Sequence, residues 1–135
     1  MRFFVRRWIV MSAAIFAAAA LVACSGSTGP QTLADRLTGT WSENGLGQFG
    51  TSFIMVLAAH DTTVTGTGSY AIEAGRSGTV TVAGVIRDPN IILTITYDYG
   101  DVAHFNAQLQ ADNTLGGAWY TVSDPVEVSF TKQAQ

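Results

Sequence analysis

Histidines and neighbouring carboxylates are the side chains of this sequence that could carry chemistry, and they are few and scattered. His60 is followed by Asp61, while His104 stands apart from both. Asp98 and Asp101 are three residues apart. A metal site needs three or four converging ligands, and hydrolysis by two carboxylates needs both acids aimed at one bond. We interpret the two histidines as solvated turn and outward strand residues, and the two aspartates as turn residues that bind backbone amides. We therefore predict no metal site and no cofactor, and expect that the protein is not an enzyme.

The single cysteine has a more distinctive setting. Cys24 follows Leu21-Val22-Ala23 at the end of an apolar, alanine-rich run that three arginines precede. A basic start and an apolar run too short for a comfortable membrane span are typical of a signal peptide. The stretch resembles the lipobox of bacterial lipoproteins. That resemblance implies removal of residues 1–23, a lipid on the Cys24 thiol and acylation of its new amino group; an uncleaved N-terminal membrane anchor is the alternative.

Cleavage after residue 23 leaves 112 of the 135 residues, enough for one domain with a modest core. Four basic and ten acidic side chains remain, a formal charge of −6 that disfavours nucleic acid as a partner. We expect attachment to the bacterial cell envelope through Cys24. Ser25, in place of the aspartate that holds many lipoproteins at the inner membrane, favours the outer membrane where the cell has one.

The start of the mature chain is small and polar. Residues 24–32 include glycine, serine and proline and cannot bury much apolar surface, so they are predicted to form a flexible tether. Thr32 stands three residues before Asp35, as in a capping box, and Leu33 and Leu37 share a helical face. A single helical turn is expected at the start of the domain, residues 33–135.

From Gly39 onward, short runs of β-branched and aromatic residues alternate with turn residues, which predicts an all-β fold. The connections are short, so neighbouring runs are expected to pair antiparallel. One face of each run is apolar and the other is polar, which favours an eight-stranded up-and-down barrel; a β-sandwich is the alternative. The eight runs are Thr40–Glu43, Thr51–Ala59, Thr63–Glu73, Thr79–Arg87, Asn90–Asp98, Val102–Gln110, Leu115–Val122 and Val126–Lys132.

Both ends of the predicted barrel resemble a known group. Gly39-Thr40-Trp41 at its start and Phe130-Thr131-Lys132 at its end resemble the calycins, the lipocalin, fatty-acid-binding and avidin group of barrels. The resemblance implies that Lys132 lies across Trp41 and closes the base of the barrel, a cation–π contact. It does not extend to the residues that hold biotin in avidin.

The inward faces are almost wholly apolar, and large side chains among them are candidates for lining a ligand cavity: Met55, Tyr97, Phe105 and Trp119. Ligand pockets are mostly apolar with a few polar groups, so a small apolar or amphiphilic molecule is the predicted ligand. Eight-stranded barrels are also found packed solid. In that alternative the protein acts through a protein partner and binds no ligand.

Overall fold

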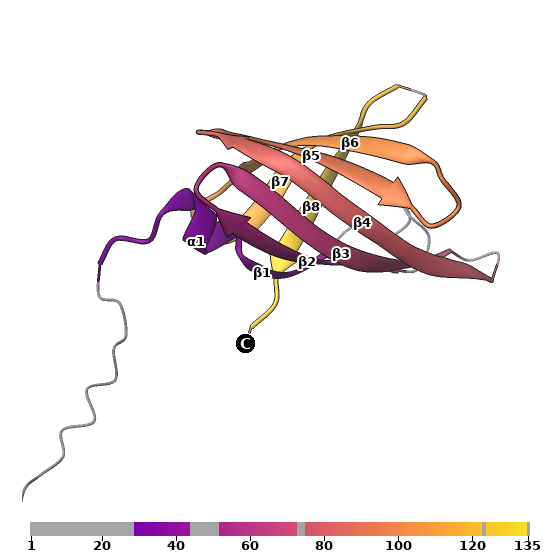
Figure 1. The fold of residues 1–135 in the computed structure, drawn as a ribbon, viewed down its shortest axis with the longest axis horizontal. Helices are drawn as coiled ribbons and strands as arrows, with labels where there is room; N and C mark the ends of the chain where they lie inside the picture. The colour runs from indigo at the N-terminus through magenta and orange to yellow at the C-terminus, as the bar shows by residue number, and fades with distance from the viewer. Residues whose placement is uncertain (1–28, 44–51, 73–74, 123, 135) are drawn as a thin grey trace, which may run out of the picture.

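The computed structural model describes residues 29–43, 52–72, 75–122 and 124–134. The predicted signal peptide, Cys24 and the first part of the tether lie outside these residues. In the described part, a short helix precedes eight antiparallel strands that close into a barrel (Figure 1). Closure confirms the predicted barrel and excludes the β-sandwich. The elements are α1 (Leu33–Leu37), β1 (Gly39–Glu43), β2 (Ser52–His60), β3 (Thr63–Ile72), β4 (Arg76–Arg87), β5 (Asn90–Tyr97), β6 (Val102–Leu109), β7 (Thr114–Tyr120) and β8 (Val126–Lys132).

The strands follow the predicted runs closely, with one larger difference. β4 begins at Arg76, within a stretch predicted to separate two strands. Arg76 pairs with Ile72, and Gly78 pairs with Tyr70, so the β3–β4 hairpin extends beyond the apolar run. Pairing with a neighbouring strand outweighs the low strand propensity of glycine and serine here. The predicted strand ends at Thr51 and Glu73 lie outside the described residues.

The core fills the inside of the barrel. Buried and exposed residues alternate along the strands: in β2, Phe53, Met55 and Leu57 are buried, and Ile54 and Val56 between them are exposed. No polar or charged residue in the described part of the chain is fully buried. Val126, which the alternation groups with buried Val128 and Phe130, is 37% exposed because it is the first residue of β8.

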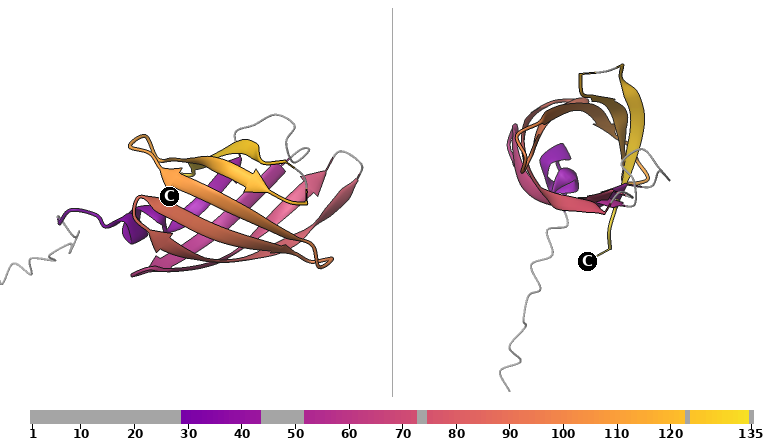
Figure 2. Two further views of the ribbon diagram at one scale, coloured as in Figure 1. Left: turned by 90° about the horizontal axis from the view of Figure 1, so that it is seen from above. Right: turned by 90° about the vertical axis from the view of Figure 1, so that its right-hand side faces the viewer.

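One mouth of the barrel is covered by α1, which lies across it in Figure 2. The helix begins with the predicted capping box, in which Asp35 N donates to Thr32 Oγ1 (3.1 Å) and Thr32 N donates to Asp35 Oδ2 (3.0 Å). The Asp35 carboxylate also accepts from Thr32 Oγ1 at 2.8 Å, and the bonds that it accepts from the side chain and the backbone of Thr32 lower the pKa of Asp35. Ala34 and Leu37, which belong to the helix, are its buried residues. We call this mouth the closed end. The opposite mouth, where β1 to β4 adjoin residues outside the described part of the chain, is named the open end.

Trp41 and Lys132 complete the closed end as predicted. Trp41 has no exposed surface, and its Nε1 donates to Leu37 O at 2.8 Å. Lys132 Nζ lies 5.7 Å from the Trp41 ring centroid and donates to Arg36 O at 2.7 Å. Burial and nearby Arg36 lower the pKa of Lys132. Gly39 has φ 144°, and a Cβ at this position would overlap the Lys132 side chain, which accounts for the glycine two residues before the tryptophan.

The barrel is closed by the pairing of β1 with β8. Trp41, Ser42 and Glu43 pair with Lys132, Thr131 and Phe130, respectively. This seam joins the two ends of the domain and is short beside the β3–β4 pairing, which extends from Thr63 to Ile72. No helix in the described ranges is long and apolar enough to cross a membrane.

Candidate functional site

The four predicted ligand-lining residues lie on the inner face at different depths. Met55 and Phe105 have no exposed surface, and Trp119 is 3% exposed. Tyr97 is half-buried and lies at the end of β5, next to the open end. Met55 is in register with Trp41 and so lies toward the closed end. The structure brings Phe105 and Trp119 together, with ring centroids 5.6 Å apart.

Two further rings that the sequence did not single out connect these residues. Phe53 contacts Tyr97, with centroids 6.4 Å apart, and Trp119, with centroids 5.5 Å apart. Phe130 contacts Phe53 at 5.9 Å and Phe105 at 5.5 Å. Most of these pairs meet edge to face, the arrangement that aromatic quadrupoles favour. A continuous set of aromatic side chains therefore extends from the middle of the core to the open end.

At the open end this set finishes in three tyrosines, which we call the tyrosine rim: Tyr70, Tyr97 and Tyr99. The Tyr97 ring centroid lies 5.2 Å from that of Tyr70 and 5.2 Å from that of Tyr99. Tyr70 is buried, whereas Tyr99 is 50% exposed. The rim thus presents an aromatic surface to solvent at the end of the barrel opposite α1.

Asp98 anchors the rim between two strands. Its Oδ1 accepts from Tyr70 Oη at 2.9 Å and its Oδ2 accepts from Thr79 N at 3.2 Å. The predicted role in binding a backbone amide is therefore present, but the amide belongs to β4 and not to the turn itself. A Cβ at Gly78 would overlap both the Asp98 carboxylate and the Tyr70 hydroxyl, so glycine leaves the space that this bond occupies.

A shallow depression of about 490 Å³ lies beside the rim. It is lined by Tyr70, Arg76, Ser77, Asp98 and Tyr99. The Arg76 guanidinium lies 5.9 Å from the Tyr99 ring centroid, within cation–π range. The depression combines an exposed ring, a guanidinium, a hydroxyl and a carboxylate, which suits a small ligand with an apolar face and a polar edge.

The hydroxyls of Tyr97 and Tyr70 stay protonated well above neutral pH. Burial is the largest cause that raises the pKa of Tyr97, to about 12, and the neighbouring Tyr99, Tyr70 and Asp101 add to it. Burial and the hydrogen bond to Asp98 raise the pKa of Tyr70. Both hydroxyls can therefore donate hydrogen bonds at any physiological pH.

Glu43 brings a carboxylate to the inner face near these rings. It follows Gly39 and Trp41 in the alternation of β1 and pairs with Phe130. Its Oε1 is buried and has no hydrogen-bond partner in the described part of the chain. Burial raises the pKa of Glu43. A hydrogen-bond donor on a ligand could pair with this oxygen. The sequence also predicts the inward position of Glu43, because it lies two residues after inward-facing Trp41 on the same strand.

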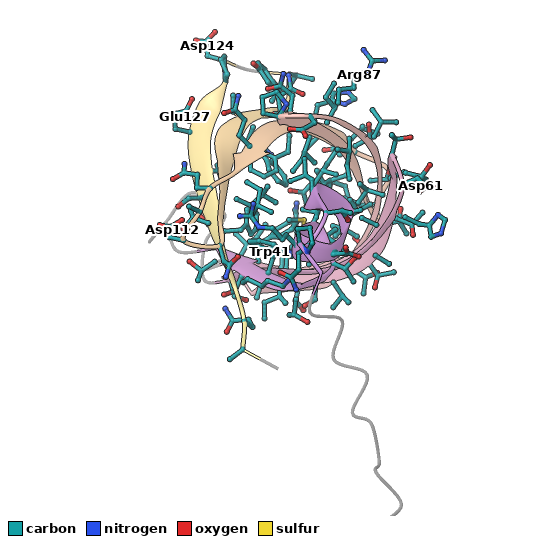
Figure 3. All side chains as sticks on the ribbon, turned by 90° about the vertical axis from the view of Figure 1, so that its left-hand side faces the viewer. Trp41, Asp61, Arg87, Asp112, Asp124 and Glu127 are labelled. Atoms are coloured by element: carbon teal, nitrogen blue, oxygen red, sulfur yellow. The ribbon has the colours of Figure 1, made fainter. Side chains whose placement is uncertain are left out.

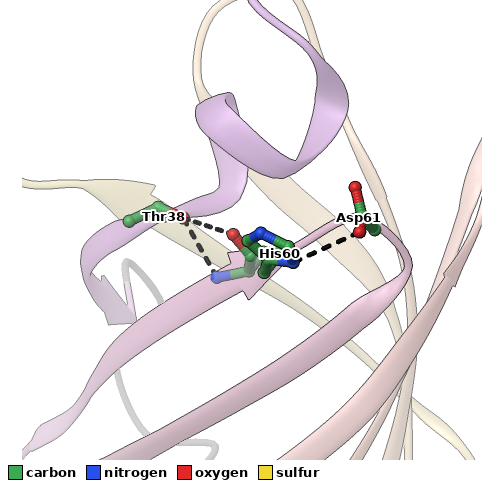
Figure 4. A network of polar contacts seen from close by, with 4 residues as sticks. Thr38, His60 and Asp61 are labelled. Carbon is green, nitrogen blue, oxygen red and sulfur yellow. Dashed lines mark hydrogen bonds and ion pairs between the residues drawn. The ribbon is translucent and has the colours of Figure 1, made fainter.

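His104 lies where the sequence placed it, whereas His60, predicted in a turn, is the last residue of β2 and pairs with Thr63. His60 Nδ1 is 3.3 Å from Asp61 Oδ2, and their side chains are 93% and 85% exposed (Figure 4). His104 is exposed on the outer face of β6. Among the described residues, no group of three or more histidine, cysteine or acidic side chains could hold a metal ion.

The place of Tyr70 in the rim was not predicted, because it depends on strand register. Tyr70 and Asp98 are 28 residues apart and meet only because β3 pairs with β4 and β4 pairs with β5. A signal was present nonetheless: Tyr97 and Tyr99 flank Asp98, the end of one predicted strand, and Tyr70 falls near the end of another on the same side of the meander.

The fold and its site define the chain as a closed, eight-stranded, antiparallel barrel with an apolar interior and an aromatic open end. No protein-family model, no curated protein and no solved structure matches it.

Proposed function

We propose that this protein is a bacterial envelope lipoprotein whose barrel binds a small amphipathic ligand at its open end. In this proposal residues 1–23 are a signal peptide, Cys24 is lipidated, and residues 24–32 tether the barrel to the membrane. The single observation that carries the ligand-binding part is the tyrosine rim, which continues into the aromatic core through Phe53.

The direction of the barrel supports this arrangement. Residues 29–32 lead into α1 at the closed end (Figure 2), and the tyrosine rim lies at the opposite end, where β3 and β5 end. An anchor attached through the tether would therefore leave the open end facing away from the membrane surface. The rim would be accessible to ligands from the surrounding compartment.

The anchor is tested with Cys24→Ala. We expect the wild-type chain to incorporate labelled fatty acid and to stay with membranes in high salt, because acyl chains and not charges hold it. Cys24→Ala should incorporate none and keep its N-terminal segment, while Ser25→Ala should behave as the wild type. Normal processing of Cys24→Ala would refute lipidation at this residue.

The ligand is tested by native mass spectrometry of the purified chain, followed by titration with fatty acids and with an amphipathic dye. Binding at the rim should quench or shift Trp119 emission through Phe53, and Tyr99→Ala should weaken it about tenfold or more. Tyr120→Ala, a half-buried tyrosine at the end of β7, is the matched control. Equal losses in both variants would count against the rim.

A second candidate is a barrel with no ligand, which acts through a protein partner. The observation that favours it is the complete burial of Met55 and Phe105, since a ligand beside them must displace side chains. Absence of any co-purified molecule, binding heat or emission change would favour this function. In neither candidate do we assign a catalytic residue, because both histidines are solvated and the Asp98 carboxylate is held by Tyr70 and Thr79.

A further inference from the structure

The carboxylate of Glu43 lies beside aromatic rings near the open end. Glu43 is the last residue of β1, is half-buried, and is in register with Phe130 on β8. β2 pairs with the other side of β1 and contributes Phe53 at the same end of the barrel. The ring of Trp119 contacts both phenylalanines, with its centroid 5.5 Å from that of Phe53 and 6.3 Å from that of Phe130. Glu43 therefore adjoins these three rings, which we call the ring cluster.

One oxygen of this carboxylate has no partner in the described part of the chain. Glu43 Oε1 is buried and accepts no hydrogen bond there. Lys132, which lies two residues after Phe130 on β8, donates to Arg36 O at the closed end instead. Buried polar atoms in proteins are nearly always paired, so an unpaired one calls for a specific reason. A donor on a ligand at the open end is such a reason, and it would offset the burial that raises the pKa of Glu43.

The open end carries an excess of negative charge. Figure 3 shows Asp124 and Glu127 pointing outward from the barrel, so the excess includes its outer edge. An excess of this kind attracts cations and repels anions at the entrance. The described acidic residues at this end are Glu43, Asp98, Asp101, Asp124 and Glu127, against Arg76 as the described basic residue.

We infer that the ligand of the open end is an amphipathic amine, whose ammonium group donates a hydrogen bond to Glu43 Oε1 while its apolar part lies along the ring cluster and the tyrosine rim. This inference rests on the proposed binding of an amphipathic ligand there and adds the chemical class of its polar group. The ammonium group neutralises the Glu43 carboxylate, and the faces of the surrounding rings attract the same positive charge.

An ammonium group suits this site better than the other common polar groups of amphipathic molecules. It combines a charge-assisted hydrogen bond with neutralisation of the carboxylate. A ligand hydroxyl can donate to Oε1, but it leaves the carboxylate charge unbalanced beside the rings. A ligand carboxylate, as in a fatty acid, is repelled by both Glu43 and Asp98. Amines should therefore bind more tightly than alcohols of the same chain length, and carboxylates less tightly.

The test uses the full chain, purified in a non-ionic detergent, and three short probes with different polar groups: hexylamine, hexanol and hexanoate. In calorimetric titration at pH 7, hexylamine should bind at least about tenfold more tightly than hexanol, and hexanoate more weakly than either. Glu43→Gln should lower the affinity for hexylamine to that for hexanol and leave the affinity for hexanol unchanged. Glu127→Gln is the matched control, because it removes the same charge from the outer face at the same end.

Thermal unfolding provides a second measurement that does not depend on the heat of binding. At equal concentration, hexylamine should raise the unfolding midpoint of the wild type and of Glu127→Gln more than that of Glu43→Gln, because a ligand stabilises the state that binds it. Suppose that hexanol binds and that Tyr99→Ala weakens it. If hexylamine then binds no more tightly than hexanol, or keeps its advantage in Glu43→Gln, the amine inference is overturned and the proposed function stands. If none of the three probes binds the wild type, both are overturned.

Discussion

Glu43 places a carboxylate on the inner face of the barrel, where burial raises its pKa. A raised pKa in the folded state means that the fold favours the protonated carboxyl. The charged form therefore costs stability at neutral pH, and this cost disappears as the pH falls through the folded-state pKa toward the ordinary value of 4.5. At neutral pH the Glu43 carboxylate beside Phe130 therefore lowers the stability of the fold.

We predict that Glu43→Gln raises the thermal midpoint at pH 7 by on the order of a few degrees, because the amide has no charge to desolvate. The difference from the wild type should shrink as the pH is lowered toward 4.5. Glu127→Gln is the control, since Glu127 is exposed on β8. Unfolding of all three proteins is followed by circular dichroism between pH 4 and pH 8. A difference that stays constant with pH would show that the Glu43 carboxylate is not the cause.

Gly78 lies where the site leaves no room for a larger side chain. We predict that Gly78→Ala costs about 1–3 kcal/mol, because the methyl group overlaps the Asp98 carboxylate and the Tyr70 hydroxyl. Gly116→Ala is the control, since the nearest atom to a Cβ there is Gln110 Nε2, at 3.4 Å. Chemical denaturation measures both variants. If Asp98 moves aside in Gly78→Ala, the absorbance titration of Tyr70 should also shift to lower pH, because the hydrogen bond that raises its pKa is lost.

At the scale of elements, α1 and Trp41 stabilise the closed end together. Trp41→Ala removes a fully buried ring and the hydrogen bond to Leu37 O, so we expect a loss on the order of 3–5 kcal/mol. That is a large part of the stability of a small domain. Gln110→Ala, at an exposed position, is the control in thermal unfolding. Equal midpoints for the two variants would contradict the role assigned to Trp41.

The strands were predictable because two signals in the sequence, the alternation of apolar and polar residues and the short turns, agree along most of the chain. Alternation placed Phe53, Leu93 and Phe105 on the inner face, and short turns required antiparallel neighbours. The start of β4 was not predictable, because Arg76 and Ser77 are held by pairing with β3 and not by their own strand propensity. The Lys132–Trp41 contact followed from resemblance to a family of barrels, since no local pattern joins residues so far apart.

The site was less predictable than the strands that build it. Phe105 and Trp119 do meet, but Tyr97 reaches Trp119 only through Phe53, which the sequence marked merely as core. The bond between Asp98 and Tyr70 depends on the registers of two hairpins. A shift of one residue in either register would turn the side chains to the other face, and a sequence pattern does not fix register so closely.

For the whole molecule, the β1–β8 seam has the shortest strand pairing in the described part of the barrel. Each strand pairs with the next along the chain, except that the seam joins the first strand to the last. Among the described residues, strand pairing at the seam joins Trp41–Glu43 to Phe130–Lys132, and Gln133 N donates to Thr40 O beside it, whereas β3 and β4 pair over the whole length of β3. Local openings need the least free energy where the fewest backbone bonds are broken.

We predict that amides at the seam, such as those of Ser42 and Thr131, exchange with solvent through openings at least about 1 kcal/mol lower in free energy than those of Thr67 and Thr81 in the middle of β3 and β4. Native-state hydrogen exchange measures this difference. Phe130→Leu should lower protection at the seam further and leave β3 and β4 at the level set by global stability. Equal protection across the barrel in both proteins would mean that it opens only by unfolding as a whole.

The seam also connects stability with the proposed function. Glu43 and Phe130 pair across it, and Phe130 contacts both Phe53 and Phe105 in the aromatic core. An opening between Glu43 and Phe130 would expose the carboxylate and the inner rings together. A ligand that enters beyond the tyrosine rim should therefore bind more slowly when the seam is made more stable. Glu43→Gln provides that change, and stopped-flow measurement of Trp119 emission should show a lower association rate than in the Glu127→Gln control. An unchanged rate would place binding wholly at the rim.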